Sequence, residues 1–173
     1  TMTRVLHAKA SSLYLIDKAT GRLVIQAAAG YQKPLVEKRA DYGLGEGVTG
    51  TIAKNGNTVR ANSIDDLHKS PGWAGKQNPG QGGLEPNSFL GLPLKVRDRF
   101  TGEERIIGVL KVEDIERTEN HPEAIFTDQD VLLVTMMANV IATVVYNTQA
   151  SSAQLQELGI SLSELSNALA GGR

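Results

Sequence analysis

The C-terminal part of the chain constrains the fold most, because it predicts one long helix that needs apolar neighbours on more than one side. The helix is expected to start at Phe126–Asp130, where Thr127 can cap the amide of Asp130 and the Asp130 carboxylate can bond back. From Val131 a helical pattern runs essentially to the C-terminus. The helix therefore has to pack on the rest of the chain and then continue past it.

Apolar residues recur along this helix at alternating spacings of three and four, over about five heptads, as in a coiled coil. A second apolar face, with Leu133, Met136, Val140 and Val145, is expected to pack on the chain's own domain. We predict one folded domain over residues 1–147, a helical linker over 148–173, and a homodimer. Gly159 favours the alternative, a frayed tail. The predicted dimer seam consists of Met137, Ile141, Val144, Leu155, Leu158, Leu162 and Leu165.

Two β-hairpins precede the helix. The first pairs Ser11–Asp17 with Arg22–Ala29, and the second pairs Ser88–Arg97 with Arg105–Asp114. Hairpins build antiparallel sheets. Because proline cannot donate a backbone hydrogen bond, Pro93 is expected at a bulge or an edge-facing position.

A long connection rich in Gly, Pro and Asn lies between the hairpins, at residues 62–87. Loops of this length in compact domains are commonly lids, binding loops or disordered segments. A lone aromatic such as Trp73 either covers the edge of the core or stacks on a planar ligand. The candidate ligand-binding residues, from this loop and the strand after it, are Asp65, His68, Trp73, Phe89 and Leu92.

Five phrases, in this order, carry a resemblance to a known family: Ser12–Asp17, Gly45–Ala53, Asn87–Leu94, Ile107–Glu113 and Phe126–Asp130. They resemble GAF domains, the small-molecule sensor modules of signalling proteins, over roughly residues 8–147. The resemblance implies an α+β fold of GAF/PAS type with an antiparallel sheet of about six strands. A ligand pocket would lie on one face of the sheet, and the terminal helices would pack on the other.

The chain departs from several branches of that family. It contains no Cys, which excludes a covalently attached bilin and the Cys-dependent free methionine sulfoxide reductase activity. Of the cyclic-nucleotide signature only Phe126 and Asp130 match, and no Asn-Lys pair precedes them. Cyclic-nucleotide binding is therefore possible but not indicated, and the ligand stays an unknown small molecule.

Composition argues against several other classes. The net charge is -1 and the basic residues are scattered, so no nucleic-acid partner is expected. No stretch approaches about 18 uninterrupted apolar residues, and the N-terminus lacks a secretory signal. We therefore expect no membrane partner and a cytoplasmic location.

Metal and catalytic motifs are not indicated. His7, His68 and His121 have no second ligand at helical spacing, so no metal site is expected; a single haem ligand at His68 is the alternative. Gly45–Gly50 is a literal GxGxxG, but its context fits a tight turn into a short helix better than a dinucleotide site. Lys111, Glu113 and Asp114 are expected on a solvated strand edge, and His121 in a solvated loop.

These observations predict a non-catalytic regulatory domain of a larger signalling protein. It would bind a small molecule between the sheet and the 62–87 loop and signal to an effector domain of the same polypeptide through its C-terminal helix. The alternative is a ligand-free dimerisation module. In that case Leu92, Leu94 and Trp73 would fill the ligand volume.

Overall fold

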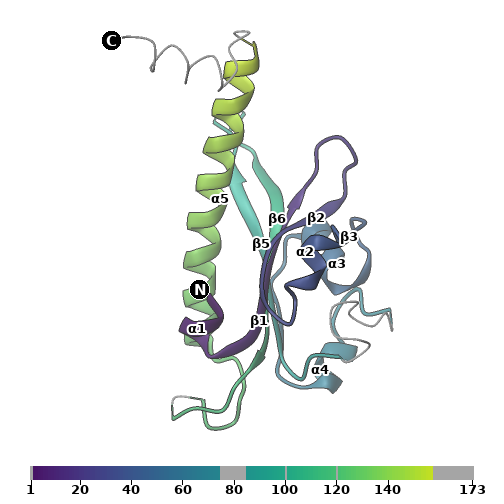
Figure 1. The fold of residues 1–173 in the computed structure, drawn as a ribbon, viewed down its shortest axis with the longest axis vertical. Helices are drawn as coiled ribbons and strands as arrows, with labels where there is room; N and C mark the ends of the chain where they lie inside the picture. Colours follow the sequence, from purple (N-terminus) through teal and green to yellow (C-terminus); the bar gives the residue numbers. More distant parts are fainter. Residues whose placement is uncertain (1, 75–84, 100, 120, 158–173) are drawn as a thin grey trace.

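The computed structural model describes residues 2–74, 85–99, 101–119 and 121–157 (Figure 1). The elements follow the predicted order, with one long helix after the second hairpin. They are α1 (Met2–Leu6), β1 (Ala8–Ile16), β2 (Leu23–Gly30), α2 (Pro34–Glu37), β3 (Asp41–Tyr42), α3 (Gly47–Asn55), β4 (Val59–Ala61), α4 (Ile64–His68), β5 (Phe89–Arg97), β6 (Glu104–Ile115) and α5 (Asp128–Glu157).

Within these residues the strands form one six-stranded sheet in the order β3-β2-β1-β6-β5-β4, with every neighbouring pair antiparallel. The two predicted hairpins are β1-β2 and β5-β6, and they meet where β1 pairs with β6. The fold is therefore the predicted α+β class with an antiparallel sheet. At the centre of the sheet, Ser12 on β1 lies opposite Lys111 on β6.

Pro93 lies within β5, and its position agrees with the expectation of an edge. Strand β4 pairs with β5 only from Phe89 to Gly91, so among the described residues β5 has no neighbouring strand beyond Gly91 on that side. A proline there removes no inter-strand hydrogen bond. The bulge in this strand follows immediately, between Leu94 and Lys95.

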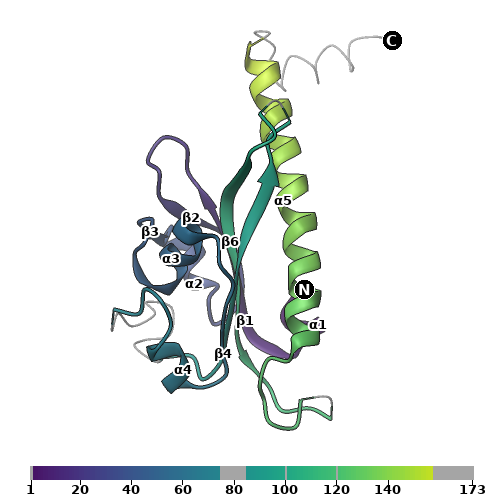
Figure 2. The same cartoon turned by 180° about the vertical axis from the view of Figure 1, so that it is seen from behind.

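The sheet separates two apolar cores. Helix α5 packs along one face, mainly on β5, and α1 lies on the same side (Figures 1 and 2). The buried α5 residues Val134, Ala138 and Ala142 contact alternate side chains of β5 and β6. The second core lies on the opposite face, beneath α2, α3 and α4. Because strand side chains alternate, each long strand of the sheet can contribute to both cores.

The side of α5 that faces away from the sheet is apolar as well. The prediction that Leu133, Met136 and Val140 pack on the domain is wrong, because all three side chains are exposed. The sheet instead receives the small side chains of α5, which allow close approach. The exposed residues Leu133, Met136, Val140 and Val144 follow one another at spacings of three and four, and we call them the outer stripe.

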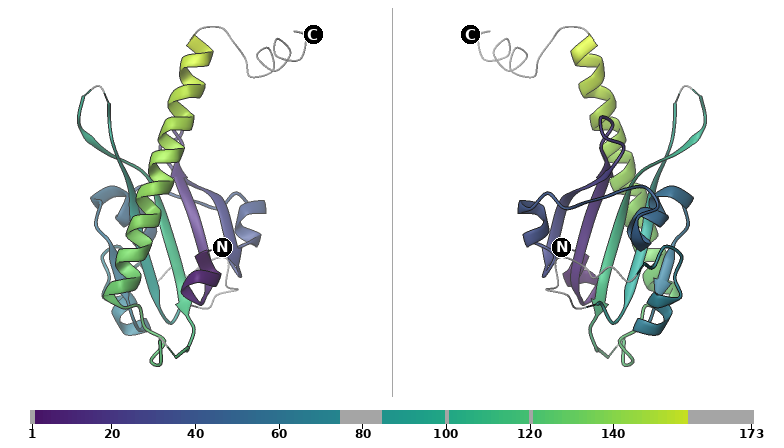
Figure 3. Two further views of the ribbon diagram at one scale, coloured as in Figure 1. Left: turned by 90° about the vertical axis from the view of Figure 1, so that its left-hand side faces the viewer. Right: turned by 90° about the vertical axis from the view of Figure 1, so that its right-hand side faces the viewer.

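Of the predicted dimer seam, the structure describes the side chains of Met137, Ile141 and Val144. Met137 and Ile141 are half-buried, and Ile141 packs on the core beneath α5; only Val144 is exposed on the outer side. Helix α5 extends beyond the end of the sheet (Figure 3). Leu155 belongs to α5, but its side chain and all of Leu158, Leu162 and Leu165 lie outside the described residues.

Candidate functional site

A pocket of about 170 Å³ lies on the sheet face opposite α5, between the sheet and helices α3 and α4. Its walls combine three aromatic rings with aliphatic side chains and several charged groups. Among the residues that line it are Asp41, Tyr42, Glu46, Val48, Leu67, Trp73, Glu85, Phe89, Lys111 and Glu113.

The glycine-rich turn between β3 and α3 forms one side of this pocket. The amide of Gly45 donates to the carbonyl of Gly50, and the amide of Gly50 donates to the carbonyl of Glu46. A Cβ on Gly50 would lie 2.2 Å from the carbonyl oxygen of Gly43, so only glycine fits this turn. The turn joins a two-residue antiparallel strand to a nine-residue helix. The GxGxxG sequence therefore forms a tight turn into a short helix, as predicted.

Two oppositely charged residues form the floor of the pocket. The prediction that Lys111 and Glu113 lie on a solvated edge is wrong: both side chains are 2% exposed, and Lys111 Nζ lies 3.0 Å from Glu113 Oε1. Their strand, β6, is central in the sheet. Helices α3 and α4 lie over this part of the sheet and bury the face of β6 that carries Lys111 and Glu113. The aromatic ring of Tyr14 lies 5.5 Å from Lys111 Nζ, within reach of a cation–π interaction.

Residues of the segment after β2 are not among the lining residues, but they hold Glu113 in place. The hydroxyl of Tyr31 donates to Glu113 and to Asp114, and the side-chain amide of Gln32 donates to Glu113. Asp114 in turn accepts the backbone amide of Asn87. Asp114 is buried too, contrary to the expected strand edge. The polar 31–42 segment gave no sequence signal for this role.

The ionisable groups in and beneath the pocket floor have shifted pKa values. Burial alone lowers the pKa of Lys111, but the adjacent Glu113 carboxylate outweighs it, and the pKa lies above its ordinary value. Lys111 is therefore an ammonium ion. Burial raises the pKa of Tyr14 to about 12, and burial together with the charges of Glu113 and Asp114 raises the pKa of Tyr31. Both tyrosines are therefore neutral at physiological pH, and the Tyr31 hydroxyl donates to the carboxylates beside it.

Two of the five predicted ligand residues, Trp73 and Phe89, line the pocket. The rings of His68 and Trp73 stack with centroids 4.7 Å apart, and His68 Nε2 lies 2.6 Å from Glu85 Oε2. Trp73, Glu85 and Phe89 line the pocket, whereas His68 braces Trp73 and is not among the lining residues.

The other two predicted residues lie elsewhere. Asp65 is exposed in the first turn of α4, which Ser63 caps by accepting the amide of Asp66. Leu92 is buried in the core beneath α5, on the opposite face of the sheet. Phe89 and Leu92 are three positions apart on one strand, so their side chains point to opposite faces. Leu92 and Leu94 therefore do not fill this pocket.

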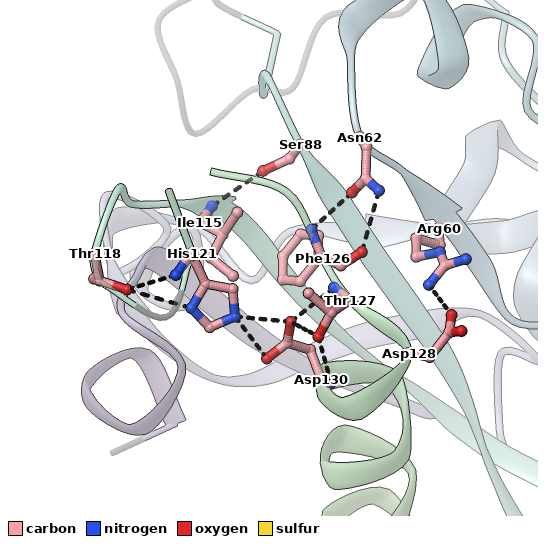
Figure 4. A network of polar contacts seen from close by, with 10 residues as sticks. All are labelled: Arg60, Asn62, Ser88, Ile115, Thr118, His121, Phe126, Thr127, Asp128 and Asp130. Carbon is pink, nitrogen blue, oxygen red and sulfur yellow. Dashed lines mark hydrogen bonds and ion pairs between the residues drawn. The ribbon is translucent and has the colours of Figure 1, made fainter. Parts of the chain in front are cut away.

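A polar network joins β4 and the loop after it to the start of α5 (Figure 4). Asn62, between β4 and α4, accepts the amide of Phe126 at 2.8 Å and donates to its carbonyl at 3.1 Å. Arg60 of β4 pairs with Asp128 at the first turn of α5. These contacts hold the start of α5 against β4 and the loop that leads into α4, the helix whose Leu67 lines the pocket.

The first turn of α5 has the predicted capping box. Thr127 Oγ1 accepts the amide of Asp130, and Asp130 Oδ2 accepts the amide of Thr127 at 2.7 Å. The expectation of a solvated His121 is wrong: its side chain is 12% exposed, and Nε2 lies 2.9 Å from Asp130 Oδ2. Burial alone raises the pKa of Asp130, but the bonds from Thr127 and His121 outweigh it and lower the pKa below its ordinary value.

Metal ligands do not gather in the part of the chain that the structure describes: no group of three His, Cys, Asp or Glu side chains could hold an ion there. The described part of α5, Asp128–Gln154, is long and apolar enough to cross a membrane by length and composition alone. Thr135, Asn139 and Thr143 interrupt its apolar run without lowering the average enough to fail that test. Core helices of soluble proteins pass the same test. The absence of a membrane partner therefore stays a prediction.

Comparison with known proteins identifies the family. The family model of the GAF domain matches residues 1–145, and the chain belongs to the GAF domain family. GAF domains are regulatory or sensor modules of signalling proteins. The predicted resemblance is therefore confirmed. No curated protein matches the chain in sequence.

Solved structures share this fold. The GAF domain of a phosphoenolpyruvate-protein phosphotransferase (ptsP) from Coxiella burnetii has a TM-score of 0.67 at 22% identity, covering 88% of this chain and 80% of that chain. The GAF-B domain of DevS from Mycobacterium smegmatis has a TM-score of 0.59 at 18% identity, covering 89% and 90%. A free methionine-R-sulfoxide reductase from Neisseria meningitidis, in complex with its substrate, has a TM-score of 0.56 at 21% identity, covering 82% and 70%. At these identities the likeness shows the fold alone.

Proposed function

We propose that this GAF domain is a non-catalytic sensor that binds a small molecule in the pocket and transmits its occupancy through α5. The observation that carries the proposal is the placement of the two parts. The pocket and α5 lie on opposite faces of one sheet, and Arg60 of β4 and Asn62 in the loop that leads to α4 bond directly to the start of α5.

The volume of the pocket favours a small ligand. About 170 Å³ is close to the 150 Å³ cavity that accepts benzene in a protein core, and below the roughly 300–1,000 Å³ of drug-sized sites. A cyclic nucleotide would need the walls to move apart. The described pocket thus supports an occupant much smaller than a nucleotide.

Two features support a role without catalysis. The free methionine-R-sulfoxide reductases have the same fold, but this chain has no Cys to supply their thiol chemistry. The charged floor residues are also engaged with one another, because Glu113 accepts from Lys111, Gln32 and Tyr31. A carboxylate held by three donors is a poor general base.

The outer stripe of α5 supports homodimerisation as the output. Leu133, Met136, Val140 and Val144 are exposed at coiled-coil spacing, and the opposite side of the helix is already packed on the sheet. A lipid environment would have to surround a helix that is covered on one side by its own domain. A second α5 needs only the outer stripe, so a second copy of the chain is the favoured partner.

The route from pocket to helix follows α4. Leu67 of α4 lines the pocket, and Asp66 in the same helix accepts the amide of Asn62 at 3.3 Å. Asn62 then holds Phe126 at the start of α5. A ligand that prefers one position of α4 would shift the population of α5 arrangements accordingly. An effector domain of the same polypeptide would receive that shift.

Native mass spectrometry of the purified chain, followed by denaturation, tests this function. We expect a dimer that carries a small molecule, which denaturation releases. The variant Val48→Phe, which enlarges a lining side chain, should lose the bound molecule and keep the dimer. A dimer that never binds a molecule from a metabolite panel would favour the ligand-free dimerisation module instead, and a monomer would remove the proposed output.

A further inference from the structure

The floor of the pocket offers hydrogen-bond donors that the described part of the protein does not use, on Lys111, whose charge is paired with Glu113. Lys111 is an ammonium with three N–H donors, and the structure gives it one hydrogen-bond acceptor among the described residues, Glu113 Oε1. Its side chain is 2% exposed, so bulk water does not serve the other donors. Lys111 also lines the pocket. A ligand with a carboxylate can supply the acceptors that this buried ammonium lacks.

The mouth of the pocket has the opposite charge. Asp41, Glu46 and Glu85 all line it, and Arg22 is shared between the first two. Glu85 is 25% exposed, and its only basic neighbour among the described residues is His68. An ammonium group entering the pocket is attracted to this acidic mouth, whereas a ligand with only negative charge is repelled there.

The walls between mouth and floor are apolar. Val48 and Leu67 face the pocket from the helical side, and Phe89 and Trp73 add two aromatic surfaces. The pocket volume fits on the order of six to ten non-hydrogen atoms, by comparison with the cavity that holds benzene. A ligand with two opposite charges and a short apolar group matches all three regions.

We propose that the pocket binds a small zwitterion, of which a free α-amino acid is the simplest, with its carboxylate on Lys111 Nζ and its ammonium facing Glu85. The apolar side chain lies between Trp73 and Phe89. A simple amine leaves the donors of Lys111 unpaired and places a second cation near them. This assignment rests on the proposed sensor function and names the chemical class of its ligand.

Isothermal titration calorimetry of the full chain with the genetically encoded L-amino acids tests the assignment. The tightest binder is then compared with its two single-charge analogues; for leucine these are isopentylamine, which lacks the carboxylate, and isocaproate, which lacks the ammonium. Because the charge is removed from the ligand, the buried floor of the protein is left intact. We expect each analogue to bind roughly ten- to a hundredfold more weakly than the amino acid.

A protein variant tests the mouth independently. Glu85→Gln should weaken amino-acid binding several-fold, whereas Glu104→Gln, which removes the same charge at the β5-β6 hairpin, should not. An unchanged affinity in Glu85→Gln would overturn the place assigned to the ammonium.

Other outcomes separate this inference from the proposed function. If either single-charge analogue bound as tightly as the amino acid, or no amino acid bound, the zwitterion assignment would be wrong. A different molecule released from the purified chain, together with failed amino-acid titrations, would overturn the assignment and leave the sensor function in place. A chain that binds nothing in the pocket would overturn both.

Discussion

The buried pair of Lys111 and Glu113 makes a quantitative prediction about stability. Replacing Lys111 by Met leaves Glu113 as an uncompensated charge in a site that is 2% exposed. Breaking a buried ion pair by removing one partner costs about 3–5 kcal/mol. Gln32 and Tyr31 still donate to Glu113, so we expect a loss near the lower end, about 3 kcal/mol.

The double variant Lys111→Met/Glu113→Gln is the matched control. The amide oxygen that Glu113→Gln introduces can accept the same donors without a charge, and uncharged replacements of buried ion pairs are often neutral. We expect the double variant to recover most of the lost stability. Urea unfolding followed by circular dichroism compares the two variants with the wild type. For a chain of this size, about 3 kcal/mol corresponds to roughly 6–12 °C in melting temperature.

The comparison of the single and the double variant shows whether the charge of Glu113 causes the loss of stability. If the double variant were at least as unstable as Lys111→Met alone, the charge of Glu113 would not be the cause of the loss. If Lys111→Met cost less than about 0.5 kcal/mol, a typical surface effect, the floor would be solvated rather than buried. Either result would refute the description of the pocket floor.

Three further predictions concern other parts of the domain. The pKa of Tyr14 is raised from 10.0 to about 12, so its contribution to stability is complete below pH 10 and is lost as the pH rises through 12. In urea unfolding at high pH, Tyr14→Phe should lose up to about 3 kcal/mol less stability than the wild type. Asp130 has a lowered pKa, so its contribution is present above about pH 4 and is lost as the pH falls through the folded value; Asp130→Asn should cost about 1–2 kcal/mol at neutral pH and progressively less in acid. Val140→Lys places a charge in the outer stripe and should convert a dimer into a monomer in sedimentation velocity experiments.

Each of these has an outcome that contradicts it. Parallel alkaline unfolding curves for Tyr14→Phe and the wild type would show that Tyr14 does not titrate differently on folding. A cost for Asp130→Asn that does not change with pH would remove the role of its charge in the capping box. For the stripe, Ala19→Lys adds the same charge at an exposed hairpin turn. Equal dimerisation in Val140→Lys and Ala19→Lys would exclude the outer stripe as the interface.

The sheet could be predicted from the sequence because its signals are local. Each hairpin has a turn with a glycine at positive φ, such as Gly21 and Gly102, between two β-rich segments. The capping residues Thr127 and Asp130 similarly mark the start of α5 through contacts within one helical turn. Local chemistry of this kind can be read from a single sequence.

The pocket floor could not be predicted in the same way. Lys111 and Glu113 alternate with apolar residues, which in most strands indicates a solvated face. They are buried because α3 and α4, which come much earlier in the chain, cover that face. The donors of Glu113 at positions 31 and 32 are about eighty residues away. Pairings at such separation leave no periodic signal.

The sequence does contain signals for two other features, the face of β5 on which Leu92 lies and the side of α5 that packs on the sheet. Phe89 and Leu92 differ by an odd number of positions, so they could not line one pocket from a regular strand. On α5, the small residues Ala138 and Ala142 indicate which side approaches the sheet, because a close approach of helix and sheet excludes large side chains. The more strongly apolar side of α5 therefore faces away from the sheet.

The fluorescence of Trp73 gives the most direct test of the central claim, that the pocket binds a small molecule. Trp73 is the only tryptophan of the chain and forms part of the pocket wall, so its emission reports on occupancy without a label. The titration panel comprises amino acids, amines, carboxylic acids and cyclic nucleotides, with Val48→Phe as the blocked control. We predict a saturable emission change for at least one small compound in the wild type and none in Val48→Phe. Emission that no compound changes, or that changes equally in both proteins, would contradict the account.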